Sequence, residues 1–216
     1  AISENVYAGN SMSRRAGFQY GRLIPSSPFG QVDSAIGKGL SVGAAGLIPP
    51  TVVVTEPFEE HTIDGIRVNF QNTPGTEAPA EMNAWFPDHK VFWAAENITA
   101  TIHNVYTLRG ALVRDALAWS KQINAALYEF GLDAEVMVSS HNWPRWGNER
   151  IQEVMRTQRD AYANLNNQVL NLANQGVTIN EIHNEYKVPP SLQKQWSARQ
   201  YHGSEFHNSR AVINRY

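Results

Sequence analysis

Three side chains that can bind a metal ion stand beside turn-forming residues or at the end of a predicted strand. Glu77 lies in the segment TPGTEAPAE, Glu96 follows the apolar run VFWAA, and His141 follows AEVMVSS. Small, turn-forming and polar residues around such positions are typical of loops that contact a ligand. Carboxylate and imidazole groups bind zinc and similar divalent metals, and the metal lowers the pKa of bound water to about 7. This placement predicts a site for metal-assisted hydrolysis.

Each of these residues also has a simpler interpretation. A glutamate in a loop is most often solvated or caps a helix, and a histidine at a strand end is more often a hydrogen-bonded structural residue than a ligand. From placement alone, both interpretations stay open. Four further histidines lack such a placement and are interpreted as ordinary: His61, His89, His103 and His183.

The composition predicts a globular chain and excludes several kinds of function. The 216 residues are 42% hydrophobic, enough to bury a core, while only 18% are charged and the net charge is −2. Dispersed charges of this kind do not predict a nucleic-acid partner. The absence of cysteine excludes thiolate catalysis, cysteine-based zinc sites and disulfides. Neither an apolar run long enough to span a membrane nor a signal peptide is present.

The central segment has the pattern of a β-meander. The β-branched run TVVVT is followed by HTIDGIRVNF, in which Asp64-Gly65 separates two alternating segments. This dipeptide is a strong signal for a two-residue hairpin turn. EMNAWF and VFWAAE complete the predicted strands. We therefore expect one sheet, with Glu77 and Glu96 in the loops at its edge.

The second half has helical periodicity around one further strand. Apolar residues spaced by three and four predict a helix over residues 108–130, with Gly131 just after its end. Residues 134–140 predict a buried strand, and Asn148 is placed to cap a long helix that ends near Gly176. The first fifty residues are rich in Gly and Pro, which favours short helical pieces, such as residues 13–21.

Several motifs resemble those of a known enzyme family. They are SENVYAGNSMSRRAGFQYG, TPGTEAPAEM, WAAEN, HNVYTLRGALVRDALAW and SSHNWPRWGN, in order along the whole chain. Together they resemble the linear alkyl sulfatases (alkyl/aryl-sulfatases) of the metallo-β-lactamase superfamily. The resemblance implies an α/β fold class: the C-terminal half of a metallo-β-lactamase-type αββα sandwich over residues 1–147, then the start of an α-helical, dimerising region over residues 148–216.

The resemblance also implies a reaction and the residues that perform it. In the complete protein, two Zn²⁺ ions would support hydrolysis of alkyl sulfate esters, such as the detergent dodecyl sulfate, to an alcohol and inorganic sulfate. The metal ligands would be Glu77, Glu96 and His141, while His202 would donate a proton or contact the sulfate. The residues implied to bind the sulfate are Asn104, Val105, Tyr106, Thr107, Leu108, Arg109 and Arg114.

The two arginines suit a sulfate ester on chemical grounds. A planar, permanently charged guanidinium matches sulfate oxygens bidentately and stabilises negative charge in the transition state. Without the resemblance, the simpler interpretation is that Arg109 and Arg114 lie on the solvated face of the predicted helix.

One signature of the family is absent from this chain. The family carries a His-x-His-x-Asp-His cluster, whereas none of the seven histidines here stands two residues from another. Three ligands cannot hold two zinc ions that each require about four donors. We therefore expect an internal piece of a longer, homodimeric sulfatase, periplasmic or secreted, whose N-terminal segment supplies the remaining ligands. The chain alone is expected to lack stoichiometric zinc and sulfatase activity.

Two alternatives to a sulfatase stay open. The first keeps the superfamily and changes the substrate to another ester, such as a lactone, or to a lactam or a phosphodiester. The second is a non-catalytic helical assembly module whose metal ligands are vestigial.

Overall fold

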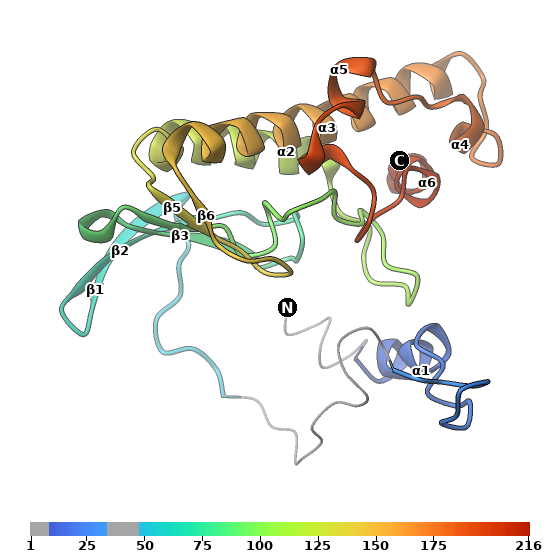
Figure 1. Ribbon diagram of the computed structural model, residues 1–216, viewed down its shortest axis with the longest axis horizontal. Helices are drawn as coiled ribbons and strands as arrows, with labels where there is room; N and C mark the ends of the chain where they lie inside the picture. Colours follow the sequence, from blue (N-terminus) through green and yellow to red (C-terminus); the bar gives the residue numbers. More distant parts are fainter. Residues whose placement is uncertain (1–8, 34–47) are drawn as a thin grey trace. The chain divides into compact units, whose positions relative to one another are not determined.

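The computed structural model describes residues 9–33 and 48–216 (Figure 1). The chain divides into two compact units, one formed by residues 1–53 and 107–112 and the other by residues 54–106 and 113–216. In the first unit, helix α1 spans Gly9–Gln19, which overlaps the helix predicted over residues 13–21. Within this unit, the Arg15 side chain donates hydrogen bonds to the carbonyls of Arg109 and Gly110 at 3.3 and 3.2 Å.

The second unit contains a six-stranded mixed sheet. Its strands follow one another in the order β1-β2-β3-β4-β5-β6, so strands that are neighbours in sequence are also neighbours in space. The pair β4–β5 is parallel and the other pairs are antiparallel. The strands are β1 (Phe58–Ile63), β2 (Ile66–Asn72), β3 (Met82–Phe86), β4 (Val91–Trp93), β5 (Val136–Val138) and β6 (Arg145–Trp146), with the 3-10 turn η2 (Pro87–His89) between β3 and β4.

The predicted hairpin is confirmed, and one predicted strand is wrong. Asp64 and Gly65 have φ values of 51° and 80° and join β1 to β2, as a two-residue hairpin turn requires. The run TVVVT, residues 51–55, forms no strand, and Val52 and Val53 are exposed. β-branched residues favour strands because they pack on neighbours, and these two side chains have no such burial.

The first long helix starts later than its periodicity predicts. Helix α2 spans Ala116–Ala126, and the Asp115 carboxylate caps it by accepting a hydrogen bond from the Ala118 N–H. Gly110, in the preceding residues, has a φ of 86° and residues 107–112 belong to the other compact unit. The apolar residues at 108 and 112 therefore continue the helical spacing without being helical.

Asn148 joins two elements rather than capping one. The π-helical turn η3 (Leu127–Gly131) follows α2, and the long helix α3 spans Asn148–Asn174 after its N-cap residue, Gly147. The Asn148 side chain donates to the carbonyls of Gly131, Leu132 and Ala134 at 2.9–3.0 Å. The start of α3 is thus tied to the end of the preceding turn.

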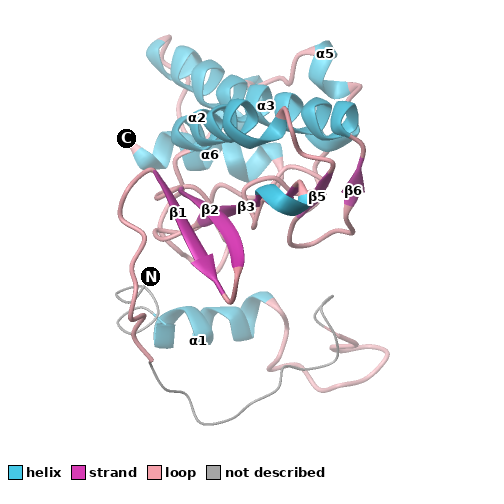
Figure 2. Cartoon of the chain, turned by 90° about the vertical axis from the view of Figure 1, so that its left-hand side faces the viewer, coloured by secondary structure: helices cyan, strands magenta, loops and turns pink. Residues whose placement is uncertain are grey.

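The C-terminal region consists of short helices. The Thr178 hydroxyl donates to the Glu181 carboxylate at 2.6 Å in the turn before α4. The elements that follow are α4 (Ile182–Glu185), α5 (Pro190–Gln193), the 3-10 turn η4 (Trp196–Ala198) and α6 (Glu205–Arg215). Helices α2, α3 and α6 lie on one side of the strands (Figure 2), and none of the described helices has both the length and the apolar character of a membrane span.

One hydrophobic core extends from the sheet into the helices. Trp119 of α2 stacks on Tyr162 of α3 with ring centroids 4.6 Å apart, and Phe92 of β4 lies 5.7 Å from Phe130. These rings and residues of α6 belong to the same buried cluster. The α/β class with a following helical region is confirmed. The domain boundary after residue 147 stays a prediction, although the core includes residues from both sides of it.

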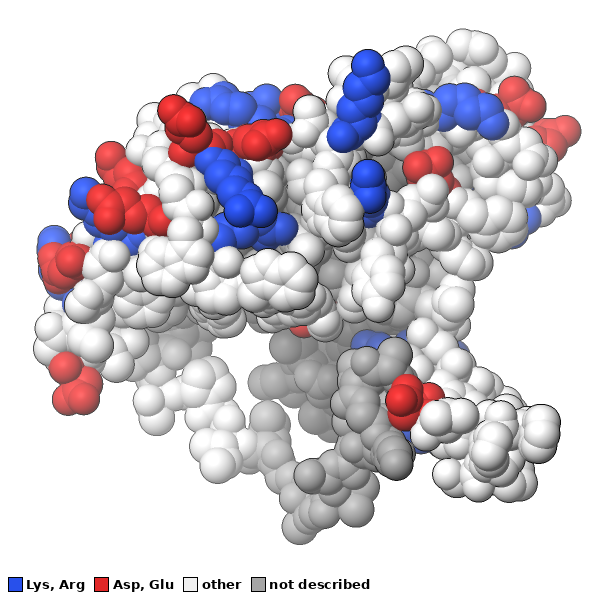
Figure 3. Space-filling model, in the orientation of Figure 1, with Lys and Arg blue, Asp and Glu red and all other residues white. Residues whose placement is uncertain are grey.

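Charged residues of both signs are interspersed on the molecular face shown in Figure 3. Lysine and arginine side chains alternate with acidic ones over the helical part of this face. This distribution agrees with the net charge of −2 and gives this face no extended region of a single sign.

Candidate metal-binding site

Five side chains converge where the loops after β4 and β5 meet the chain before α6. Nε2 of His103 lies 3.2 Å from one oxygen of Glu96, and Nε2 of His141 lies 3.4 Å from the other. Two triplets have ligand atoms within 4.8 Å of one another: Glu77, Glu96 and His103, and His103, His141 and His202. His103 belongs to both triplets. We call these five residues the polar cluster.

The sheet places Glu96 and His141 side by side. Strands β4 and β5 are parallel, so the loops that follow them leave the same edge of the sheet. The Ser140 N–H donates to the Ala95 carbonyl at 2.9 Å and holds the two loops together. Ala95 and His141 have φ values of 46° and 67°, an uncommon conformation for residues with side chains that is often found at functional sites.

Buried amides hold the Glu77 and Glu96 loops. The side-chain amide of Asn97 donates to Thr73 Oγ1 and to Asn83 Oδ1, each at 2.9 Å, and all three residues are buried. The Thr76 hydroxyl in turn donates to the Thr73 carbonyl at 2.7 Å. Because the buried Asn97 amide bonds to Thr73 and Asn83 at once, it ties the two carboxylate-bearing loops to each other.

His103 is the most deeply buried histidine of the cluster, with 1% of its surface exposed. Its Nδ1 lies 3.0 Å from the Asn104 carbonyl oxygen and 3.3 Å from a guanidinium nitrogen of Arg114. Its Nε2 points toward the Glu96 carboxylate, which can only accept a hydrogen bond, and a bound metal ion would take the place of the proton between them. The His103 backbone N–H donates to the Tyr162 hydroxyl at 3.1 Å, and its carbonyl accepts from Asn208 at 3.1 Å.

A glycine allows His202 to reach the cluster. A Cβ on Gly203 would lie 2.4 Å from the His103 carbonyl oxygen, so a side chain is excluded there. The His202 ring stacks on His103 and also contacts His141, with centroids 4.2 and 4.4 Å apart. Burial, and then the charges of His103 and His141, lower the pKa of His202 to about 4. Its imidazole is therefore neutral at pH 7, and the predicted proton-donor role stays a prediction.

Arg114 is part of the wall around the cluster rather than a solvated helix residue. It is 8% exposed and precedes α2, so the alternative of a solvated helical face is wrong for this residue. Its guanidinium donates to the carboxylate and carbonyl of Glu77 and to the Asn104 side-chain oxygen, and it donates to the Asn104 carbonyl at 2.8 Å. The ion pair with Glu77 orients one of the predicted metal ligands.

The other residues predicted to bind sulfate lie in different parts of the structure. Asn104 donates to the His202 carbonyl at 3.2 Å and so borders the polar cluster. Val105 is fully buried, and its N–H donates to Asn208, while Tyr106 is half-buried. The last three residues, Thr107, Leu108 and Arg109, belong to the other compact unit. Their role in sulfate binding stays a prediction.

Glu81 is a third carboxylate beside the cluster. Burial, followed by the neighbouring carboxylate of Glu77 and the charge of Glu96, raises the pKa of Glu81 to about 8. By contrast, the hydrogen bond from His103 is the largest cause that lowers the pKa of Glu96 to about 2. Glu81 is therefore protonated at pH 7 without a metal, and a bound cation would favour its ionised form. Carboxylates together with imidazole nitrogens fit a divalent metal ion.

Glu81→Gln is expected to stabilise the metal-free protein at pH 8. With its folded-state pKa raised above 4.5, Glu81 lowers the stability of the fold as the pH rises from about 4.5 to 8. The substitution removes this loss, which we estimate at about 1–2 kcal/mol because the side chain is partly exposed. Urea denaturation at pH 5 and pH 8 measures the difference in the free energy of unfolding between the parent and the variant. An equal effect of the substitution at both pH values would contradict this origin.

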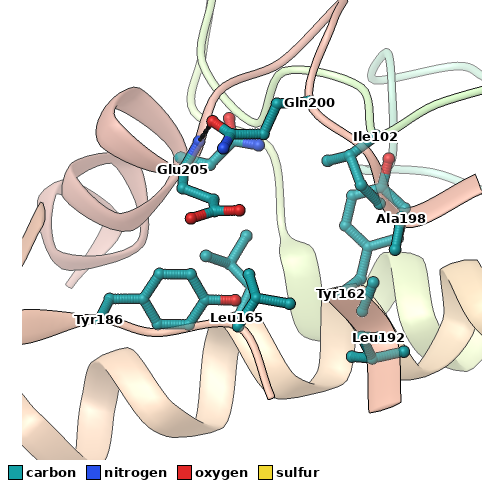
Figure 4. A pocket seen from close by; sticks show the side chains of 11 residues that line it. Ile102, Tyr162, Leu165, Tyr186, Leu192, Ala198, Gln200 and Glu205 are labelled. Atoms are coloured by element: carbon teal, nitrogen blue, oxygen red, sulfur yellow. Dashed lines mark hydrogen bonds between the residues drawn. The ribbon is translucent and has the colours of Figure 1, made fainter. Parts of the chain in front are cut away.

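A small apolar pocket is lined by residues of α3 and of the C-terminal segment (Figure 4). It has a volume of about 390 Å³ and is lined by Ile102, Tyr162 and Leu165, among others. Glu205 points toward Tyr186 at its edge, and burial raises the pKa of the Glu205 carboxyl group. Tyr162 thereby connects this pocket to the His103 backbone.

The predicted ligands Glu77, Glu96 and His141 are brought together, and two further residues were missed. His103 was interpreted as ordinary, and Glu81 was not among the candidates. A usable signal for His103 was its position directly before Asn104, in the loop that begins at Glu96. Glu81 gave no comparable signal, because its pKa depends on neighbours that only the fold assembles.

The fold and the polar cluster define an α/β protein with a candidate metal site at one edge of its sheet. The chain is 46% identical over 212 residues to a linear primary-alkylsulfatase of a Pseudomonas species, covering 98% of this chain and 32% of that protein. It is 44% identical to an alkyl/aryl-sulfatase of Saccharomyces cerevisiae, covering 100% of this chain and 33% of that protein. Residues 178–216 match the family model described as alkyl sulfatase dimerisation.

The solved structure of an alkylsulfatase has the same fold over the whole of this chain. The stereoselective inverting sec-alkylsulfatase of a Pseudomonas species superimposes with a TM-score of 0.91 at 43% identity, covering 100% of this chain and 34% of that one. The predicted resemblance to the alkyl sulfatases is confirmed over the whole chain. The chain spans about a third of the length of the curated relatives that it matches.

Proposed function

We propose that this chain is part of a metal-dependent hydrolase that converts alkyl sulfate esters to an alcohol and inorganic sulfate. The observation that carries the proposal is the convergence of Glu77, Glu96, His103, His141 and His202, beside a buried arginine, in a chain similar to alkylsulfatases over its whole length.

The polar cluster supplies the ligands of the proposed metal cofactor. Glu77, Glu96 and His141 would hold it, with Nε2 of His103 and the ring of His202 close enough to share in binding. A bound zinc-like ion supplies a Lewis acid and a water molecule of lowered pKa. We further propose that the metal is zinc, with two ions bound when additional ligands are supplied by a longer polypeptide.

The residues around the cluster suit a sulfate group. The Arg114 guanidinium, fixed by Asn104 and Glu77, offers donors in a planar fork that matches sulfate oxygens. Its buried position strengthens its interaction with charge that develops on the sulfate. The neutral imidazole of His202 accepts a proton or binds metal, and it donates a proton once it has been charged during turnover.

Sulfate release from dodecyl sulfate tests the proposal. We expect release from this chain only when it is combined with a segment that carries a His-x-His-x-Asp-His cluster and with added zinc, and we expect a chelator to stop it. Turnover of a chromogenic lactam or a phosphodiester in place of dodecyl sulfate would favour another hydrolase. Unchanged release by a Glu96→Ala variant would favour a non-catalytic role for the cluster.

We also infer that residues 178–216 take part in homodimer formation. The support is their match to the alkyl sulfatase dimerisation family, together with exposed Phe206 and Tyr216 on or next to α6. Sedimentation of the protein with Phe206→Ser measures the contribution of this helix to dimer formation.

A periplasmic or secreted location of the protein stays a prediction.

A further inference from the structure

A second hollow, separate from the polar cluster, lies at β6 and the start of α3. Its empty volume, part of which is open to solvent, is about 1080 Å³, and none of the five cluster residues lines it. Three tryptophans from two segments line it: Trp143, Trp146 and Trp196. We call this hollow the tryptophan pocket.

Arg145 lines the tryptophan pocket and is buried. Only 8% of its surface is exposed, and its Nη1 atom has no hydrogen-bond partner among the described residues. Its backbone belongs to β6 and pairs with Met137 of β5, which fixes its position. A buried charge without a counter-charge is costly, so a fold that keeps one there gives up stability for another purpose.

The charges around Arg145 favour an anion. Burial, and then the positive charge of Arg150, lower the pKa of Arg145, although a guanidinium remains charged at neutral pH. Glu153 is the only acidic residue that lines the pocket, and within the described residues no ion pair joins it to Arg145 or Arg150. Two arginines therefore face the hollow with one exposed carboxylate near them.

The tryptophans supply an apolar surface around these charges. Trp143, Trp146 and Trp196 are 81%, 69% and 64% exposed, which is unusual for large aromatic side chains on a monomer. The guanidinium of Arg199 lies 4.4 Å above the Trp196 ring and holds that ring in place. Exposed indole rings around a buried cation can contact the apolar part and the anionic group of one molecule.

We propose that the tryptophan pocket binds amphiphilic oxyanions, that is, a sulfate, sulfonate or carboxylate head on an alkyl or aryl body. Arg145 and Arg150 bind the head, and the three indole rings cover the apolar body. The guanidinium fork matches such heads, whereas a neutral amphiphile leaves Arg145 unpaired. This inference goes beyond the proposed hydrolysis, because binding here needs neither the metal nor turnover.

Titration calorimetry with octane-1-sulfonate tests the proposal. The ligand cannot be hydrolysed as an ester, and the protein is kept metal-free with a chelator so that the polar cluster does not contribute. We expect saturable binding to the parent protein. Arg145→Met is expected to weaken binding about 10- to 100-fold, as for the loss of hydrogen bonds to a charged group. Inorganic sulfate and octyl glucoside are expected to bind much more weakly.

Two further variants keep the test independent of folding. Arg145→Met removes an unpaired buried charge, so its melting temperature is expected to equal or exceed that of the parent. Exposed Trp143→Ala is expected to weaken binding about fivefold without changing the fold, and Arg67→Gln, on the exposed hairpin, is expected to bind as the parent does. Equal affinity for octyl glucoside, or unchanged affinity in both Arg145→Met and Trp143→Ala, would overturn the proposal.

Discussion

In the complete protein, replacing Glu96 with glutamine is expected to weaken zinc binding by at least about 100-fold, the upper end of losses seen when an outer-shell partner of a ligand is removed. The two oxygens of Glu96 lie 3.2 Å from His103 and 3.4 Å from His141. Glu96 is thus the residue that connects both halves of the polar cluster. An uncharged amide removes the negative charge that draws a cation to this point. Chelator competition and elemental analysis measure the loss.

The same substitution should also change stability without metal. Because His103 lowers the pKa of Glu96 to about 2, Glu96 stabilises the fold above about pH 4.5, and this contribution is lost as the pH falls toward 2. At pH 7 we expect Glu96→Gln to cost about 1–2 kcal/mol, discounted for partial exposure. In the complete protein, added zinc should raise the melting temperature of the parent and of Glu60→Gln, an exposed control. A similar rise in Glu96→Gln would show that the ion binds elsewhere.

Replacing Arg114 with methionine is expected to lower the free energy of unfolding by about 3–5 kcal/mol, as for a buried pair that loses one partner. Arg114 is 8% exposed and donates to both Glu77 and Asn104. Without it, the Glu77 carboxylate keeps its charge beside Glu81 and loses its counter-charge. Urea denaturation at pH 7 measures the change. Arg67→Met, which breaks an exposed ion pair with Asp88, should change the free energy of unfolding far less, because water screens exposed charges.

A double-mutant cycle assigns this loss to the ion pair. Glu77→Gln combined with Arg114→Met should be more stable than the sum of the two single changes predicts, because neither charge is then left alone. Arg114→Lys should cost less than Arg114→Met, since it keeps the charge and loses the fork. Additive effects would mean that Arg114 acts through Asn104 and packing instead.

Short sequence patterns predicted the elements whose conformation depends on residues close by in the sequence. Asp64-Gly65 favoured a hairpin turn because its backbone angles suit that turn, and the structure has it. The long apolar periodicity after Asn148 predicted α3 and its end near Gly176. Residues 108–115 show the same spacing but are not helical, because residues 107–112 belong to the other compact unit and Asp115 caps the helix.

The cluster was predicted only in part because its members come from distant segments. Glu77, Glu96 and His141 were placed by strand ends and by family motifs. His103 became a candidate only when its ring was seen 3.2 Å from Glu96 and stacked on His202. Strand β6 was also missed, since two residues within an aromatic turn carry no strand pattern.

By itself, the sequence determined the α/β class, the hairpin and long helix, the resemblance to alkyl sulfatases and, through that resemblance, four candidate residues of the polar cluster, His202 among them. These follow from periodicity, turn chemistry and motif order, which act over short stretches of chain. The tertiary structure decided that His103 joins the cluster, that Arg114 pairs with Glu77, and that Nη1 of Arg145 is buried without a hydrogen-bond partner among the described residues. Burial and electrostatic pairing depend on distances between residues up to a hundred positions apart, and only folding sets those distances.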